Sequence, residues 1–313
     1  MRTRVVFLSK NEARISEIDI DKPKRDEVLI ETKACGICMS EVHVFEGRLP
    51  GGQLAGHEGV GVVVEVGEEV DNVKPGDKVT TLGGPAFADL YKTSKQNVVK
   101  IPEDVEDFAY WISEPLACVI NGIRSSEIQV ADNVCVVGCG YMGLLMIQAM
   151  PKKIIDNLIA LDIRSERLKL AKDFGADFTL NPREVEVIKE VRDIIGGEAD
   201  IVIEASGVPG TLNLATKLVR KGGKLVIFGY HAEDEVLPTG EWHVKGLKIL
   251  NTSPSFSTNF EKDFYDAIKL LKKGVFDQRR LITHRFSLED IEEAFKIASE
   301  KPVNYIKGVV IFQ

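Results

Sequence analysis

The sequence predicts an α/β protein with two domains, one rich in β-strands and one built on a doubly wound parallel sheet. The chain has 313 residues, more than one typical hydrophobic core requires. Residues 1–120 contain mostly short β-branched runs, whereas strand-like and helix-like segments alternate from about residue 122. We therefore expect residues 1–121 and 259–313 to form one domain and residues 122–258 to form the other.

The composition argues against several classes of protein. The chain is 44% hydrophobic and 28% charged, and its formal net charge is −8, which is ordinary for a globular protein. It has no basic stripe, so a nucleic-acid partner is not expected. No apolar run is long enough for a membrane helix, and the N-terminus turns polar too early for a signal peptide. We expect a cytoplasmic protein that acts on a small molecule.

The β-rich domain is predicted from segments that are dense in β-branched residues and bounded by turn residues. "VLIETKACGI" (28–37) and "GVGVVVEVG" (59–67) are such segments, and "VKPGDKVTTL" (73–82) is a turn at Pro75 and Gly76 followed by a strand. Many short strands in succession favour a barrel or a sandwich.

The alternating region begins with the apolar run "NVCVVGCG", which a helix-like segment follows. Further strands are expected in "NLIALDI", "ADIVIEASG" and "KLVIFGY", and further helices in "SERLKLAKDFG" and "TLNLATKLVRKGG". Short, continuous apolar strands suit a parallel sheet that is buried on both faces. After about residue 258 the pattern changes to helix, "LITHRF", helix and a last strand "YIKGVVIF". This last segment is expected to pack back on the β-rich domain.

Gly138, Gly140 and Gly143 form the pattern G-x-G-x-x-G between a predicted strand and a predicted helix. In that context the glycines permit a tight turn, a close approach of the backbone to a pyrophosphate, and packing of helix on strand. The free N–H groups of the helix N-terminus favour an anion there. We therefore predict a dinucleotide site, in which Tyr141 and Met142 occupy the last two variable positions of the loop.

Asp162 ends the strand that follows the glycine loop. A carboxylate at this position accepts hydrogen bonds from the adenosine ribose of NAD and repels the additional phosphate of NADP. Arg164 lies two residues later, and its guanidinium would suit that phosphate. We therefore predict NAD as the cofactor, with NADP as the alternative.

A candidate catalytic or metal site of the β-rich domain lies in "KACGICMSEVH" (33–43), where Cys35 and Cys38 are three residues apart. The spacing alone fits a redox dithiol, half of a structural zinc site, or a single working cysteine. "GHEGVG" adds His57 and Glu58, and "SEPLAC" adds Glu114. Cysteine, histidine and acid together compose the donor set of a catalytic zinc site, which uses about three protein ligands.

Taken together, the motifs "CGICMSEVH", "GHEGVGVVVEVG", "PGDKV", "EPLA", "VVGCGYMG", "DIVIEASG" and "LITHRF" resemble those of the zinc-dependent medium-chain alcohol and polyol dehydrogenases, in the same order and over essentially the whole chain. The resemblance implies a GroES-like β-barrel catalytic domain combined with a Rossmann domain. It also implies one catalytic zinc ion, NAD, and membership of the branch that contains the sorbitol and threonine dehydrogenases.

The resemblance assigns roles to individual residues. Cys38 and His57 match zinc ligands, Glu58 or Glu114 matches the acid that contacts zinc or holds its water, and Cys35 matches a cysteine that is not a ligand. Glu41 matches an acid that orients the ligand histidine, Ser40 and His43 match the two ends of a proton relay, and Cys118 matches a position near the nicotinamide.

The chain departs from many relatives because it has no cysteine from residue 39 to 117. The lobe that holds a second, structural zinc is thus expected to be missing, which puts the usual tetramer in doubt and leaves a homodimer or tetramer open.

The expected activity is hydride transfer between NAD(H) and a secondary alcohol of a polyol, sugar or sugar acid. Three alternatives remain open at this level. One is an L-threonine 3-dehydrogenase, another is a zinc-free quinone reductase, and the third is an NAD-binding regulatory protein without turnover.

Overall fold

The computed structural model describes residues 1–254 and 257–313. The chain divides into two compact units, the first formed by residues 1–117 and 261–313 and the second by residues 118–260. In these described residues, no helix is both long and apolar enough to cross a membrane.

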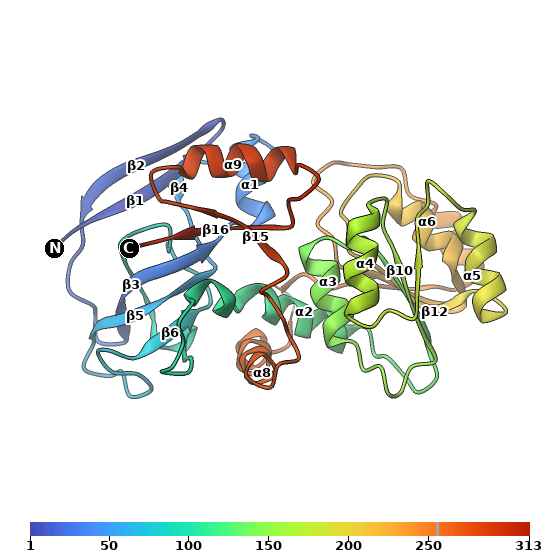
Figure 1. The fold of residues 1–313 in the computed structure, drawn as a ribbon, viewed down its shortest axis with the longest axis horizontal. Coiled ribbons are helices and arrows are strands. Elements are labelled where there is room, and N and C mark those ends of the chain that lie inside the picture. Colours follow the sequence, from blue (N-terminus) through green and yellow to red (C-terminus); the bar gives the residue numbers. More distant parts are fainter. Residues whose placement is uncertain (255–256) are drawn as a thin grey trace. The chain divides into compact units, whose positions relative to one another are not determined.

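The first unit is built mostly from antiparallel strands, and the last two strands in the sequence, which are parallel to each other, extend one of its sheets. Its strands are β1 (Arg2–Ser9), β2 (Glu12–Asp19), β3 (Glu27–Gly36), β4 (Gln53–Leu54), β5 (Gly59–Val66), β6 (Lys78–Thr81), β7 (Leu90–Ser94), β8 (Val98–Lys100), β15 (Ile282–Phe286) and β16 (Lys307–Ile311). They form one sheet in the order β2-β1-β4 and a second in the order β15-β16-β3-β5-β6-β8, with β7 also paired to β3. Figure 1 shows β16 returning beside β3, and the pairing sets Val310 opposite Cys35.

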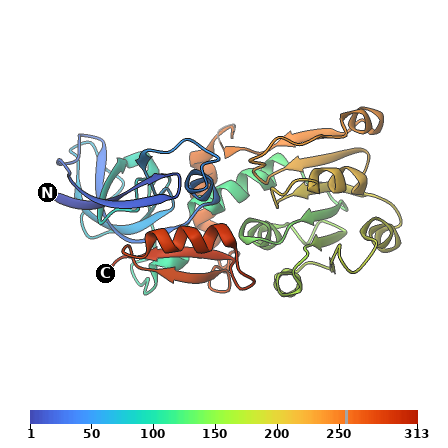
Figure 2. The same cartoon turned by 90° about the horizontal axis from the view of Figure 1, so that it is seen from above.

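Short helices complete this unit. They are α1 (Met39–Phe45), η1 (Lys95–Asn97), η2 (Phe108–Trp111), α8 (Phe260–Lys272) and α9 (Ile291–Glu300), together with the start of α2 (Glu114–Ser125). Figure 2 shows α9 lying along the strands of its own C-terminal segment. Phe295 of α9 stacks on Phe45 of α1 and meets the edge of Phe87, so the last helix closes the core of the first unit.

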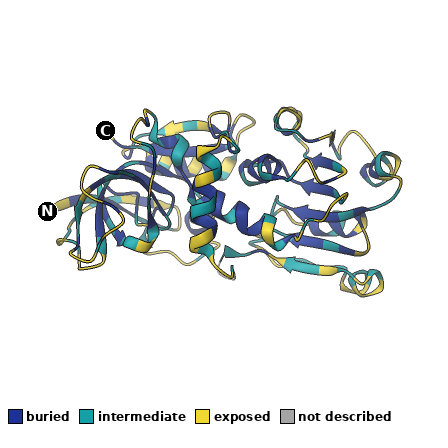
Figure 3. Ribbon diagram, turned by 90° about the horizontal axis from the view of Figure 1, so that it is seen from below, coloured by how far each residue is buried: buried dark blue, intermediate teal, exposed yellow. Residues whose placement is uncertain are grey.

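The second unit is a six-stranded parallel sheet in the order β11-β10-β9-β12-β13-β14. Along the chain its elements are β9 (Asn133–Val137), α3 (Tyr141–Ala149), β10 (Asn157–Leu161), α4 (Ser165–Asp173), β11 (Phe178–Leu180), α5 (Val187–Ile195), β12 (Ala199–Glu204), α6 (Thr211–Leu218), β13 (Val219–Ile227), α7 (Thr239–Lys245) and β14 (Lys248–Asn251). Figure 3 shows the central strands buried and the connecting turns exposed. The strand order reverses between β9 and β12, which is where such folds bind nucleotides.

One predicted element is wrong in extent. A helix was expected over residues 211–223, but α6 ends at Leu218 and β13 begins at Val219. Val219 pairs with Ala199, and the register then shifts so that Lys224 pairs with Ile201. Gly222 has φ +68°, a left-handed conformation that glycine adopts without strain, so the chain bulges inside the strand instead of extending the helix.

Candidate metal and cofactor sites

Two segments of the first unit bring together three of the predicted metal-ligating side chains. Cys38 is the N-cap residue of α1, and His57 and Glu58 directly precede β5. One donor atom from each of the three lies within 4.8 Å of the other two. Zinc bonds of about 2.0–2.3 Å place neighbouring donors roughly 3.5–4 Å apart, so the group fits zinc after a small adjustment. Over residues 1–254 and 257–313, this is the one group of three or more such side chains that could hold a metal ion.

Glu41 ties these segments to one another. Its Oε1 accepts hydrogen bonds from the backbone N–H of Gly56 at 2.6 Å and lies 3.1 Å from Nδ1 of His57. Its Oε2 accepts from the backbone N–H of Cys38 at 3.3 Å. A carboxylate on Nδ1 orients the ring and directs Nε2 outward, which is the usual support for a metal-ligating histidine.

The surroundings of His57 shift its proton affinity. Burial acts to lower the pKa of His57, but the charges of Glu41 and Cys38 outweigh burial and hold the pKa well above its usual value. These charges therefore favour the form of the ring with protons on both nitrogens. Because zinc binds a deprotonated imidazole nitrogen, we expect metal binding at His57 to release one proton.

Glu58 is fully buried and is paired with a buried lysine. Nζ of Lys307, on β16, lies 2.8 Å from Oε1 and 2.6 Å from Oε2 of Glu58, and it also donates to the carbonyl of Ile37 at 2.9 Å. A Cβ at Gly36 would lie 1.9 Å from Oε2 of Glu58, so only glycine leaves room for the pair. Sequence reasoning missed Lys307. The available signal was a single lysine inside the apolar run "YIKGVVIF".

The structure separates the two cysteines. Cys35 points into the core with no exposed surface, and burial raises the pKa of its thiol well above the usual value. A thiol held neutral in this way is a poor ligand and a poor nucleophile. Cys38, in contrast, is half-buried and lies in the group with His57 and Glu58.

Three other predicted site residues of this unit lie outside the group of Cys38, His57 and Glu58. Glu114 is the first residue of α2 and lies outside the group of three donors. Ser40 is exposed and donates to Sγ of Cys38 at 3.3 Å. His43 is buried on the same helix, with Nδ1 3.2 Å from Oε2 of Glu46.

The cofactor residues lie at the carboxyl ends of β9 and β10 in the second unit. Gly138 has φ +100°, and Gly140 is the N-cap of α3. A Cβ at Gly143 would lie 1.9 Å from the carbonyl oxygen of Gly138, so the helix packs directly on the turn. At Gly140 the nearest such contact is 4.0 Å away, which leaves the backbone open to a ligand. The loop thus has the shape that a pyrophosphate requires.

Asp162 holds this loop from the next strand. Its Oδ2 accepts from the backbone N–H of Cys139 at 2.7 Å, and its Oδ1 accepts from the N–H of Arg164 at 2.9 Å. A carboxylate has about four acceptor positions, so each oxygen retains capacity for a ribose hydroxyl. Arg167 lies 4.0 Å from Oδ2. At the start of α3, Tyr141 is buried and Met142 is half-buried, and Cys118 is half-buried on α2.

Comparison with known proteins identifies the family. The sequence model "Alcohol dehydrogenase GroES-like domain" matches residues 24–103, and the model "Zinc-binding dehydrogenase" matches residues 142–273. The chain belongs to the zinc-dependent medium-chain dehydrogenases.

Relatives of this dehydrogenase cover nearly its whole length. Sorbitol dehydrogenase of Ovis aries is 28% identical over 95% of this chain and 93% of that protein. L-threonine 3-dehydrogenase of Bacillus velezensis is 27% identical over 95% of this chain and 96% of that protein. The crystal structure of 2R,3R-butanediol dehydrogenase from Bacillus subtilis is 25% identical and superposes with a TM-score of 0.87 over 100% of both chains. The predicted fold class and the predicted zinc- and NAD-dependent alcohol oxidoreductase are thereby confirmed.

Proposed function

We propose that this dehydrogenase oxidises a secondary alcohol of a polyol, sugar or sugar acid, with NAD as hydride acceptor. The observation that carries the proposal is the group formed by Cys38, His57 and Glu58, with Glu41 on the histidine. When bound, zinc withdraws charge from the substrate oxygen and NAD accepts the hydride. The residues of the chain supply the ligands, the orientation and the path for the proton.

Cys38 and His57 are the proposed ligands from the protein, and the third is Glu58 or Glu114. The proximity of Glu58 supports it, since its carboxylate already lies beside the other two donors. Lys307 competes for the same carboxylate and would keep it as a neighbour of the metal. Zinc content of Glu58→Gln and Glu114→Gln distinguishes these roles, because loss of a direct ligand lowers zinc occupancy more than loss of a neighbour does.

Ser40 and His43 are proposed to move the released proton. The hydroxyl of Ser40 is exposed beside Sγ of Cys38, where it can accept a proton from the substrate. His43 lies one turn further along α1, and Glu46 fixes its ring through Nδ1. The pKa of Glu46 is lowered, because hydrogen bonds from Ser299 and His43 outweigh its burial, so this carboxylate is charged at neutral pH.

The test is zinc per chain on purified, chelator-washed protein, followed by a screen of polyols, sugar acids and threonine with NAD. About one zinc and turnover of a polyol or sugar acid would support the proposal. Zinc-free protein that does not take up added metal would contradict it and favour the quinone reductase, and zinc without turnover would favour a regulatory role.

The second candidate is an L-threonine 3-dehydrogenase. The favouring observation is the relative of that name, which matches 95% of this chain. A threonine dehydrogenase requires side chains that bind the ammonium and carboxylate groups of the substrate. A higher turnover rate with threonine than with every polyol in the same screen would favour this candidate. A cytoplasmic location and a homo-oligomeric state remain predictions.

A further inference from the structure

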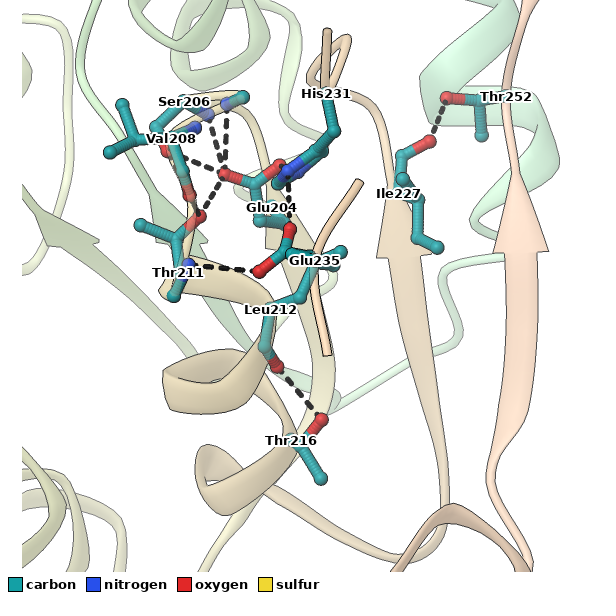
Figure 4. A network of polar contacts seen from close by, with 12 residues as sticks. Glu204, Ser206, Val208, Thr211, Leu212, Thr216, Ile227, His231, Glu235 and Thr252 are labelled. Carbon is teal, nitrogen blue, oxygen red and sulfur yellow. Dashed lines mark hydrogen bonds and ion pairs between the residues drawn. The ribbon is translucent and has the colours of Figure 1, made fainter. Parts of the chain in front are cut away.

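A buried network of charges joins the two loops that follow β12 and β13. Glu204, the last residue of β12, has no exposed surface. Its Oε1 accepts from the N–H groups of Ser206 and Gly207 at 2.8 and 3.1 Å, and from the hydroxyls of Ser206 and Thr211 at 2.6 and 2.8 Å (Figure 4). The two backbone N–H groups can only donate, so Oε1 acts as their acceptor, and the Thr211 hydroxyl shares its one proton between Oε1 and the carbonyl of Val208 at 2.6 Å.

His231, in the loop after β13, lies between this carboxylate and a second one. Its Nε2 is 2.9 Å from Oε2 of Glu204, and its Nδ1 is 2.7 Å from Oε1 of Glu235 (Figure 4). The other oxygen of Glu235 accepts from the N–H of Gly210, back on the first loop. The Nε2 contact is a hydrogen bond, whereas the Nδ1 contact is a close ion-pair approach without hydrogen-bond geometry. The network therefore closes a ring of contacts between residues 204–211 and 228–235.

The backbones of these two loops touch where the network holds them. A Cβ at Gly207 would lie 2.4 Å from the carbonyl oxygen of Tyr230, and one at Gly229 would lie 2.6 Å from Oε2 of Glu204. The first loop also touches the glycine loop, since a Cβ at Gly138 would lie 2.7 Å from Cβ of Ser206. These close approaches hold the loops 204–211 and 228–235 at a fixed spacing beside the glycine loop.

The position of the network in the sheet indicates what it serves. A doubly wound sheet consists of two mononucleotide-binding halves, and the acid after the second strand takes the adenosine ribose. Asp162 follows β10, so the half formed by β9, β10 and β11 takes the adenosine portion. The carboxyl ends of β12 and β13, where the network lies, therefore face the nicotinamide portion.

We propose that His231, held between Glu204 and Glu235, is a positioning residue for the nicotinamide half of the dinucleotide. It sets the spacing of the loops 204–211 and 228–235, and it does not touch the reacting atoms. The inference rests on the proposed function only in that NAD binds at this edge of the sheet.

The test compares two ligands on the full chain carrying His231→Gln. NADH spans both halves of the sheet, whereas AMP occupies the adenosine half alone. We expect the Kd for NADH to rise about tenfold, as for the loss of a hydrogen bond to a charged group, and the Kd for AMP to change less than about twofold. An equal rise for both ligands, or no change for either, would overturn the proposal. Failure of the unaltered chain to bind NADH would instead contradict the proposed function.

Two further variants distinguish a specific effect on NADH binding from a general loss of folding. Glu235→Gln removes the charge beside Nδ1 of His231 at nearly constant volume, and it should reproduce the selective loss of NADH. His243→Gln changes an exposed histidine on α7 of the same unit and should leave both affinities unchanged. If His231→Gln does not fold, an unchanged NADH affinity in Glu235→Gln overturns the proposal by itself.

Discussion

The metal-ligating group of the first unit and the cofactor edge of the second are held in different ways. In the first, side chains are the proposed ligands, and buried charged residues from other segments fix them, as Glu41 fixes His57 and Lys307 fixes Glu58. In the second, the proposed contacts to the cofactor are backbone N–H groups, and carboxylates such as Asp162 hold the loop that presents them. Loss of a buried charge should thus impair metal binding and stability in one unit, and only cofactor affinity in the other.

The largest expected effect is on stability, in Lys307→Met. Removing the lysine leaves Glu58 charged, buried and unpaired, which costs about 3–5 kcal/mol of the free energy of unfolding. Denaturant unfolding of the metal-free protein measures this loss. The double variant Lys307→Met with Glu58→Gln should recover most of it, because neither charge of the pair then remains. A loss below about 1 kcal/mol in the single variant would show that the pair does not carry this role.

The next effect is on turnover, in Cys38→Ser. A hydroxyl is a weaker zinc ligand than a thiolate, so zinc content and kcat should fall by more than about 100-fold, beyond the range expected for a supporting residue. NADH binding, followed by fluorescence, should be nearly unchanged because the glycine loop is intact. An equal loss of NADH binding would mean that the two sites are wrongly assigned.

Glu41→Gln tests the support of the ligands without touching a donor atom. The amide loses the negative charge beside His57, so zinc affinity should fall about 10–100-fold. Competition with a metal chelator gives the affinity. Glu103→Gln, a change at an exposed acid of the same unit, is the matched control. Equal affinities in the two variants would rule out the supporting role of Glu41.

The smallest effect is expected in the second unit, in Asp162→Gly. Loss of the carboxylate removes hydrogen bonds to the ribose and the repulsion of the additional phosphate, so NAD affinity should fall about tenfold while NADP binding improves. The ratio of kcat/KM for the two cofactors measures the change. Asp162→Asn retains an acceptor for the N–H of Cys139 and separates the loss of charge from the loss of the loop contact. An unaltered ratio would exclude Asp162 as the residue that sets cofactor preference.

The cofactor residues were accessible to sequence reasoning because their signal is local. Three glycines and an acid within one βαβ segment fix a turn, a helix N-terminus and a strand end. The proposed metal ligands were not accessible in this way, since the fold brings Cys38 and His57 together, and their prediction rested on the resemblance to a family. Lys307 was missed because it lies 249 residues from Glu58. The end of α6 was misjudged because the bulge at Gly222 depends on pairing with β12.

The pairing of Lys307 with Glu58 also has a consequence for the order in which the protein is made. Cys38, His57 and Glu58 leave the ribosome early, but the neighbouring strand β3 gains its partner β16, which carries Lys307, only after the whole second unit has been synthesised. Until then Glu58 has no buried cation beside it. We therefore expect the enclosure of Glu58 beside the proposed metal site to be among the last events of biosynthesis.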